Sequence, residues 1–113
     1  MICRVWRGWT RREDAAAYQA LLKNEIMPGI HARDIPGLVA HQALRREITN
    51  NDGLAETEHM TLMWFETLAA VEGFVGPDYG VANMPAKAAA ILSRWDARVA
   101  HYDVFDAVGQ PTR

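Results

Sequence analysis

The chain has 113 residues, of which 50% are hydrophobic and 23% charged, and its formal net charge is -2. This length suits one domain with a buried core, which excludes global disorder. It contains no apolar run long enough to cross a bilayer and no signal peptide, so we expect a cytoplasmic protein without a membrane partner. Basic residues do not cluster, which argues against a nucleic-acid partner. The single Cys3 excludes an intrachain disulfide and a thiolate zinc site.

The first part of the chain predicts a strand followed by a helix. Residues 2–9 are β-favouring and aromatic. Thr10 and Glu13 have the spacing of a capping box, which predicts that a helix begins there. Pro28 and Gly29 are expected to end or kink that helix.

The middle of the chain predicts two strands joined by a tight turn. Residues 38–48 and about 57–65 are the β-favouring runs. Between them, residues 49–53 contain Asn, Asp and Gly, which tolerate the positive φ that tight hairpins need.

The last part predicts two helical segments and a final strand. A short helix is expected to begin at Thr67 and end at Gly76. A second is expected to begin near Asn83, with Ala88, Ile91, Leu92 and Trp95 along one face. The last strand is placed at residues 98–105.

This order, βαββαβ, predicts an α+β fold of the ferredoxin-like type with one antiparallel sheet, over a single domain of residues 1–106. Residues 107–113 are expected to form a flexible C-terminal tail. Right-handed connections place both helical segments on one face of the sheet. The strands carry apolar side chains on both faces, so we expect a homodimer in which two sheets pack face to face.

Several stretches resemble the antibiotic biosynthesis monooxygenase-like family of dimeric α/β barrels, in their order and spacing over residues 1–106. The stretches are Met1-Ile2-Cys3-Arg4-Val5-Trp6-Arg7-Gly8-Trp9-Thr10, Pro36-Gly37, Leu44-Arg45-Arg46, Leu62-Met63-Trp64-Phe65-Glu66-Thr67, Phe74-Val75-Gly76 with Asp78-Tyr79, and His101-Tyr102-Asp103-Val104.

The resemblance implies a dimeric barrel and a cofactor-independent monooxygenase acting on an aromatic or enolisable small molecule. Haem-degrading relatives carry Asn, Trp and His at the positions that Arg7, Gly73 and Asn83 occupy here, so haem degradation is not expected. No cofactor is predicted. Two alternatives stay open: a non-catalytic binding or stress-response protein of the same architecture, and an isomerase or cyclase.

His59 and His101 are the candidate catalytic residues, because a neutral imidazole on a predicted strand can accept a phenolic proton near neutral pH. The alternative for each is an ordinary structural histidine paired across the sheet. No metal site is predicted, since the four histidines show no local ligand spacing. If a metal did bind, His59 with Glu58 or Asp103 would be the first set to test.

Arg7 is a candidate substrate-binding residue, because it alternates with apolar residues and a buried guanidinium needs an anionic or carbonyl partner. The alternative is an ion pair with an internal carboxylate. Arg4 is expected to face the other way, toward the dimer interior. Trp9, Trp64 and Tyr102 complete the predicted substrate-binding set, with ordinary core packing as the alternative.

Overall fold

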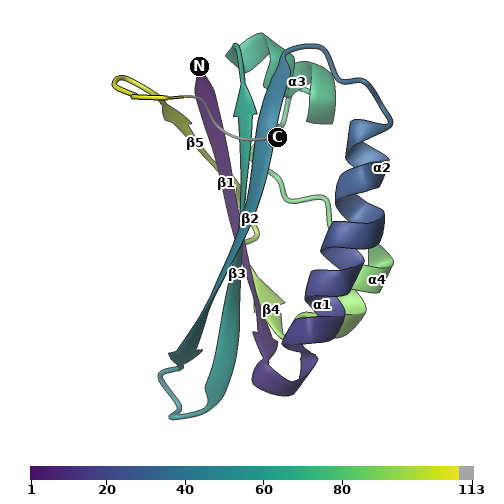
Figure 1. Cartoon of the computed structure of the whole chain (residues 1–113), viewed down its shortest axis with the longest axis vertical. Helices are drawn as coiled ribbons and strands as arrows, with labels where there is room; N and C mark the ends of the chain where they lie inside the picture. Colours follow the sequence, from purple (N-terminus) through teal and green to yellow (C-terminus); the bar gives the residue numbers. More distant parts are fainter. Residues whose placement is uncertain (110–113) are drawn as a thin grey trace.

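A computed structural model describes residues 1–109 of the chain. One antiparallel sheet runs through the molecule in the strand order β2-β3-β1-β4, and β5 also pairs with β1 (Figure 1). The strands are β1 (Ile2–Arg11), β2 (Leu38–Thr49), β3 (Ala55–Phe65), β4 (Arg94–Trp95) and β5 (Ala100–Asp103). Within the described part of the chain, no helix is long and apolar enough to cross a membrane.

The helices lie on one face of this sheet, and the other face is left open (Figure 1). The helical elements are a 3₁₀ turn η1 (Arg12–Asp14), α1 (Ala15–Leu21), a π-helical stretch η2 (Leu22–Ile26), α2 (Met27–His31), α3 (Leu68–Val75) and α4 (Ala86–Ile91). The arrangement confirms the α+β, ferredoxin-like fold class predicted from the sequence.

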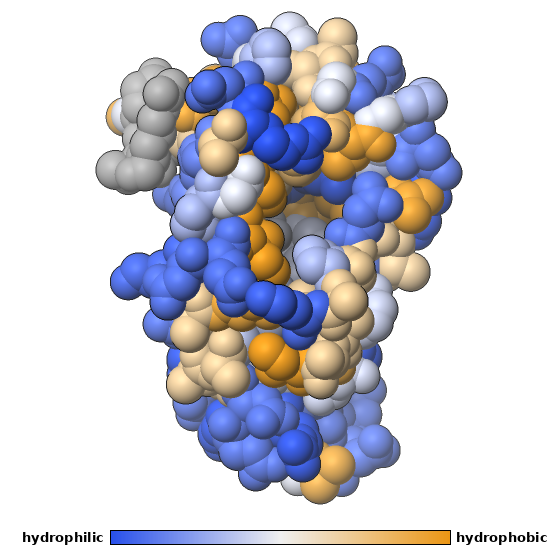
Figure 2. Space-filling model, turned by 90° about the vertical axis from the view of Figure 1, so that its right-hand side faces the viewer, coloured by the Kyte–Doolittle hydropathy of each residue, from blue (hydrophilic) through white to orange (hydrophobic). Residues whose placement is uncertain are grey.

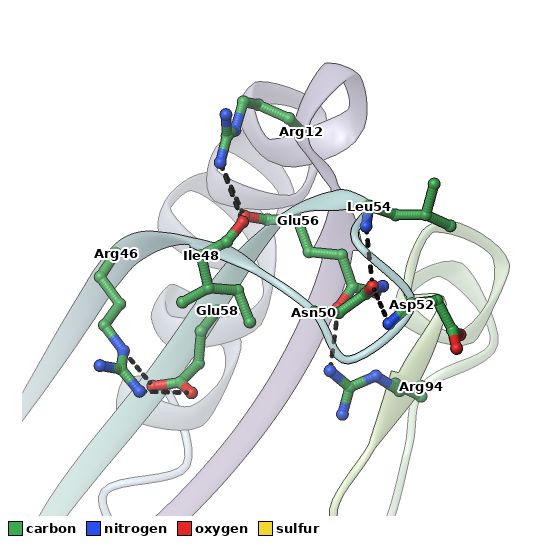
Figure 3. Close-up of polar contacts among 9 residues, drawn as sticks. All are labelled: Arg12, Arg46, Ile48, Asn50, Asp52, Leu54, Glu56, Glu58 and Arg94. Atoms are coloured by element: carbon green, nitrogen blue, oxygen red, sulfur yellow. Dashed lines mark hydrogen bonds and ion pairs between the residues drawn. The ribbon is translucent and has the colours of Figure 1, made fainter.

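The turn and the α3 boundaries agree with the sequence prediction. Oδ1 of Asn50 accepts hydrogen bonds from the amides of Asp52 and Leu54, both at 2.9 Å, and Gly53 has a φ of 79° (Figure 3). These contacts close the β2–β3 hairpin. At α3, the hydroxyl of Thr67 accepts from the Ala70 amide at 3.1 Å, and the helix ends at Gly76.

The first helix begins later than predicted. Thr10 lies inside β1 and makes no N-cap, because its hydroxyl contacts His59 of β3 instead. Of the two outcomes predicted at Pro28 and Gly29, an end or a kink, the end does not occur, since α2 continues to His31. The π-helical stretch directly before α2 accommodates the missing amide hydrogen and the bulk of the Pro28 ring.

The C-terminal elements are shorter than predicted. α4 ends at Ile91, and Trp95 lies in β4, where it pairs with Gly8. The amide of Ser93 donates to the carbonyl of Trp9 at 2.8 Å, so this segment satisfies β1 backbone groups that β5 does not reach. β5 covers only Ala100–Asp103 of the predicted residues 98–105.

The C-terminal boundary of the domain stays a prediction. In the predicted tail of residues 107–113, residues 107–109 are exposed, and residues 110–113 lie outside the described residues.

The register of the strands decides which side chains lie beneath the helices. Arg4 pairs with Met63, and Trp6 with Thr61, and these four side chains line a cavity on the helical side. The prediction that Arg4 faces the dimer interior is therefore wrong. It rested on alternation alone, and alternation does not say which of two apolar faces the helices cover.

The open face is part apolar and part charged. Val5 and Leu62 pair across β1 and β3 on this face, near the half-buried Trp64. Toward the β2–β3 hairpin, this face carries the buried carboxylates of Glu56 and Glu58. Glu56 forms an ion pair with Arg94 at 2.9 Å, and Glu58 forms one with Arg46 at 3.1 Å (Figure 3). These charged pairs interrupt the apolar surface that the sequence predicted for the whole face.

Candidate functional site

Two candidate cavities lie between the sheet and the helices, and the larger of these two has a volume of about 510 Å³. Its wall is mostly apolar, with Trp6 and Met63 from the strands, Met27 from α2 and Phe74 from α3. Figure 2 shows the helical side of the molecule, where apolar residues gather around a hollow. The size and the apolar wall are typical of small-molecule sites.

A buried guanidinium forms part of this wall. Arg4 is 8% exposed, and its Nη1 donates to the carbonyl oxygen of Tyr79 at 2.7 Å. The same Nη1 lies 3.0 Å from Nε2 of His101. Burial lowers the pKa of Arg4 to about 10, so the side chain remains a cation at neutral pH.

His101 is held as a neutral base beside this cation. Because a guanidinium can only donate, Nε2 of His101 must accept, and the ring proton lies on Nδ1. Burial, followed by the charge of Arg4, lowers the pKa of His101. Its ring also packs edge-on against Tyr79, with centroids 5.0 Å apart. His101 thus contacts the cation of the larger cavity from behind its wall.

A smaller cavity of about 360 Å³ holds the other three histidines, His31, His41 and His59. Nε2 of His31 lies 2.6 Å from Nδ1 of His41, a contact that requires one of the two nitrogens to be unprotonated. Burial and the neighbouring His31 lower the pKa of His41. Leu22 and Met27 line both cavities, so the two lie next to each other along η2 and α2.

His59 forms part of the inner wall of the smaller cavity. It is 3% exposed, its Nε2 lies 3.1 Å from the hydroxyl of Thr10, and its ring packs edge-on against Tyr18. Burial, with a smaller effect of Arg45, lowers the pKa of His59 to about 4. His59 is therefore neutral at physiological pH and a weaker base than a free imidazole.

The structure divides the predicted site residues between the two faces of the sheet. His59 and His101 face the helices, whereas Arg7, Trp9, Trp64 and Tyr102 lie on the open face. One layer of sheet therefore separates the two candidate bases from the four predicted substrate contacts.

None of the four open-face residues lines either of these two cavities, although Trp64 lines a separate open-face hollow of about 530 Å³ with Gln42 and Val104. The Arg7 side chain is 43% exposed and bonds Asp96 at 2.9 Å, so the predicted burial of its guanidinium is wrong. The guanidinium groups of Arg7 and Arg94 lie over the Trp9 ring, at 5.2 and 4.1 Å from its centroid. Trp64 donates to Gln42 at 3.3 Å, and Tyr102 is mostly exposed.

The suggested metal set is not brought together. Glu58 bonds Arg46 on the open face, and His59 is buried on the helical face. Among residues 1–109, no three His, Cys, Asp or Glu side chains are grouped so that they could hold a metal ion.

Sequence reasoning missed Arg4 as the cavity cation. The signal that would have found it is Gly8, two residues beyond Trp6 on the same strand face. A Cβ at Gly8 would lie 2.7 Å from the Trp6 ring, so the glycine leaves room for an indole packed along the helical face. Arg4 shares that face.

The fold is similar to that of a monooxygenase from the gene ActVA-Orf6 of Streptomyces coelicolor, solved in complex with the ligand nanaomycin D. The match has a TM-score of 0.51 at 14% sequence identity, and covers 96% of this chain and 91% of the other. No family model and no curated protein matches the sequence. At this identity the likeness supports the fold and leaves the chemistry open.

Proposed function

We propose that this protein is a cofactor-independent monooxygenase that oxidises an aromatic or enolisable small molecule in the larger cavity. The observation that carries the proposal is a mostly apolar space of about 510 Å³ whose wall holds a buried cation in contact with a neutral imidazole. The likeness to a monooxygenase that holds a ligand supports the choice of reaction class.

Arg4 and His101 have complementary roles in this proposal. A phenol or enol oxygen bound to Arg4 loses its proton more readily, because the nearby guanidinium stabilises the anion. In this proposal Nη1 of Arg4 turns from His101 to the substrate oxygen, which frees Nε2 of His101 to accept that proton. The lowered pKa of His101 keeps Nε2 unprotonated at neutral pH until then. His59 is the second candidate base and would serve a ligand in the smaller cavity.

The oxidation needs molecular oxygen and no external reductant. An activated CH₂ group next to the anion reacts with O₂ and becomes a carbonyl. One oxygen atom forms the new C=O bond, and the other leaves as water with the two hydrogens. The substrate supplies all the electrons, and the apolar wall keeps the reactive anion away from bulk water.

We also propose that two copies pair through their open sheet faces. Leu44 is 47% exposed and Tyr102 is 59% exposed, and both lie on that face. Covering large apolar side chains stabilises an assembly by roughly 1.5–3 kcal/mol for each one fully buried. In this arrangement Trp64 and Tyr102 are interface residues, and Arg4 takes the substrate-binding role predicted for Arg7.

The proposal is tested by measuring oxygen uptake with a panel of hydroxylated aromatic compounds. We expect uptake that falls by about 10²-fold or more in the His101→Ala variant, as is typical of a lost general base. His59→Ala tests the second base, and His31→Ala is a control for the His101 variant, because the His31 ring lines only the smaller cavity. Unchanged uptake in both the His101 and the His59 variants would remove the proposed bases.

The same experiment separates the two alternatives. Product formation without oxygen uptake would support an isomerase or cyclase, since a base and a cation suffice to move a proton. Saturable binding with neither product nor uptake would support a non-catalytic binding protein.

A further inference from the structure

Two guanidinium groups contact one aromatic ring, that of Phe74, in the larger cavity. The Cζ atoms of Arg4 and Arg33 are 5.7 and 4.9 Å from the centroid of Phe74. Arg33 Nη2 donates to the carbonyl oxygen of Phe74 at 3.0 Å, and Arg4 Nη1 to that of Tyr79 at 2.7 Å. Arg4 is buried and Arg33 is exposed, so one cation lies deep in the cavity and the other near solvent.

Neither cation has an acidic partner. Within residues 1–109, Arg4 and Arg33 are the arginines that form no ion pair with a carboxylate. In the same part of the chain every other arginine forms one: Arg7, Arg11, Arg12, Arg45, Arg46, Arg94 and Arg98. The described lining of the cavity contains no Asp and no Glu. The cavity therefore carries positive charge that the protein leaves uncompensated.

Arg4 keeps a whole edge of its guanidinium without a partner. Both of its hydrogen bonds use Nη1, and neither Nε nor Nη2 bonds another atom of residues 1–109. Among residues 1–109, Oγ1 of Thr57 is the only fully buried side-chain N or O atom without a hydrogen-bond partner. Nε and Nη2 of Arg4, which also have no partner, are therefore accessible to solvent. Nε and Nη2 together form the edge that binds both oxygens of a carboxylate in parallel.

We propose that the ligand of the larger cavity is an organic monoanion, with a flat apolar body and one carboxylate that binds the Nε–Nη2 edge of Arg4. Trp6, Met27 and Met63 contact the apolar body, and Arg33 attracts the anion at the solvent side. Burying a carboxylate is unfavourable without a paired cation, and Arg4 supplies that cation in advance. A carboxylate also supplies the negative charge that the buried guanidinium lacks.

This inference deepens the proposed function, on which it rests only for the choice of cavity. It adds that the oxidised molecule is a carboxylic acid. In that case the carboxylate binds Arg4 through Nε and Nη2, and the reacting oxygen lies near Nη1 and His101.

The test is calorimetric titration with 2-naphthoate and with 2-naphthamide, its neutral counterpart of nearly the same shape. We expect the acid to bind at least about tenfold more tightly than the amide, because charge-assisted bidentate hydrogen bonds form only with the acid. Arg4→Met removes the preference, and Arg33→Met weakens it. Arg11→Met is the matched control, since Arg11 is exposed at the end of β1 and does not line the cavity.

The following results would overturn the inference. Equal affinity for the acid and the amide, or no binding of the acid at millimolar concentration, would exclude a carboxylate-binding cavity. A preference that survives in both Arg4→Met and Arg33→Met would place the acid elsewhere. Circular dichroism reports whether Arg4→Met folds. If it does not, the acid–amide comparison on the natural chain and on the Arg33→Met variant still decides whether the cavity binds a carboxylate.

Oxygen uptake distinguishes this inference from the proposed function. Preferred binding of 2-naphthoate without oxygen uptake from any hydroxylated aromatic acid would leave the anion site standing and remove the monooxygenase. Oxygen uptake with neutral phenols alone, and no acid–amide preference, would support the monooxygenase and exclude the anion site.

Discussion

Oγ1 of Thr10, on β1, lies 3.1 Å from Nε2 of His59, on β3, and both side chains are buried on the helical face of the sheet. Thr57 is the cross-strand partner of Thr10 and is buried as well, but its hydroxyl has no hydrogen-bond partner within residues 1–109. Two facing threonines of the same sheet thus differ in whether their hydroxyl is bonded.

This difference predicts opposite effects of one substitution. Thr10→Val leaves Nε2 of His59 without its partner and is expected to lower the free energy of unfolding by about 1–3 kcal/mol. Thr57→Val removes an unbonded buried hydroxyl at nearly constant volume and is expected to be neutral or stabilising. Urea denaturation of both variants measures the two values. Equal losses would show that the Thr10–His59 contact contributes nothing specific.

Acid should destabilise the protein through His59. Its pKa is lowered to about 4 in the folded chain, whereas a histidine in the unfolded chain titrates near 6.5. As the pH falls from about 6.5 to 4, the unfolded chain binds a proton that the folded chain does not, so the free energy of unfolding decreases, by roughly 3 kcal/mol for this group. Above pH 6.5 this contribution is fully present.

The His59→Gln variant isolates that contribution. His41 and His101 also have lowered pKa values and act in the same direction, so the decrease should become smaller in the variant without vanishing. Urea denaturation at pH 7.5 and pH 4.5 measures it. An identical decrease in the natural chain and the variant would contradict the assignment to His59.

Gly8 should tolerate no side chain. A Cβ there would lie 2.7 Å from the Trp6 ring and 3.0 Å from a methyl group of Leu92, so Gly8→Ala is expected to cost about 1–3 kcal/mol. Gly73 lies inside α3 with no atom within 4 Å of the corresponding position, and Gly73→Ala should stabilise by about 0.5–1 kcal/mol. Thermal unfolding of the two variants compares them, and a stable Gly8→Ala protein would mean that Trp6 repacks freely.

The open sheet face should hold two copies together at micromolar concentration. Leu62→Arg places a charge in the apolar part of that face, next to Val5, and is expected to yield single copies. Leu54→Arg is the control, because Leu54 is already 62% exposed near the β2–β3 turn. Sedimentation velocity reports the state of each. A natural chain that sediments as one copy would refute the proposed pairing.

Local sequence signals predicted the elements whose geometry depends on neighbouring residues. The β2–β3 turn follows from Asn50 and Gly53, and the α3 boundaries follow from Thr67 and Gly76, because a cap or a positive φ is decided within a few residues. The order of these elements was sufficient to predict the ferredoxin-like fold.

The candidate site depended on long-range contacts that no local pattern encodes. Thr10 has the sequence of an N-cap, but its hydroxyl bonds His59, 49 residues away. Trp95 has the spacing of the apolar face predicted for the last helix. It lies instead in β4, where it pairs with the free edge of β1.

By itself, the sequence determined which residues alternate along each strand, and only the tertiary structure decided which set the helices cover. Both sets on β1 are largely apolar, so burial could be satisfied either way, and the choice placed Arg4 in the cavity and Arg7 on the open face. The chemistry of the cavity follows from that choice. A shift of the register by one residue would place Arg7 beneath the helices and Arg4 on the open face.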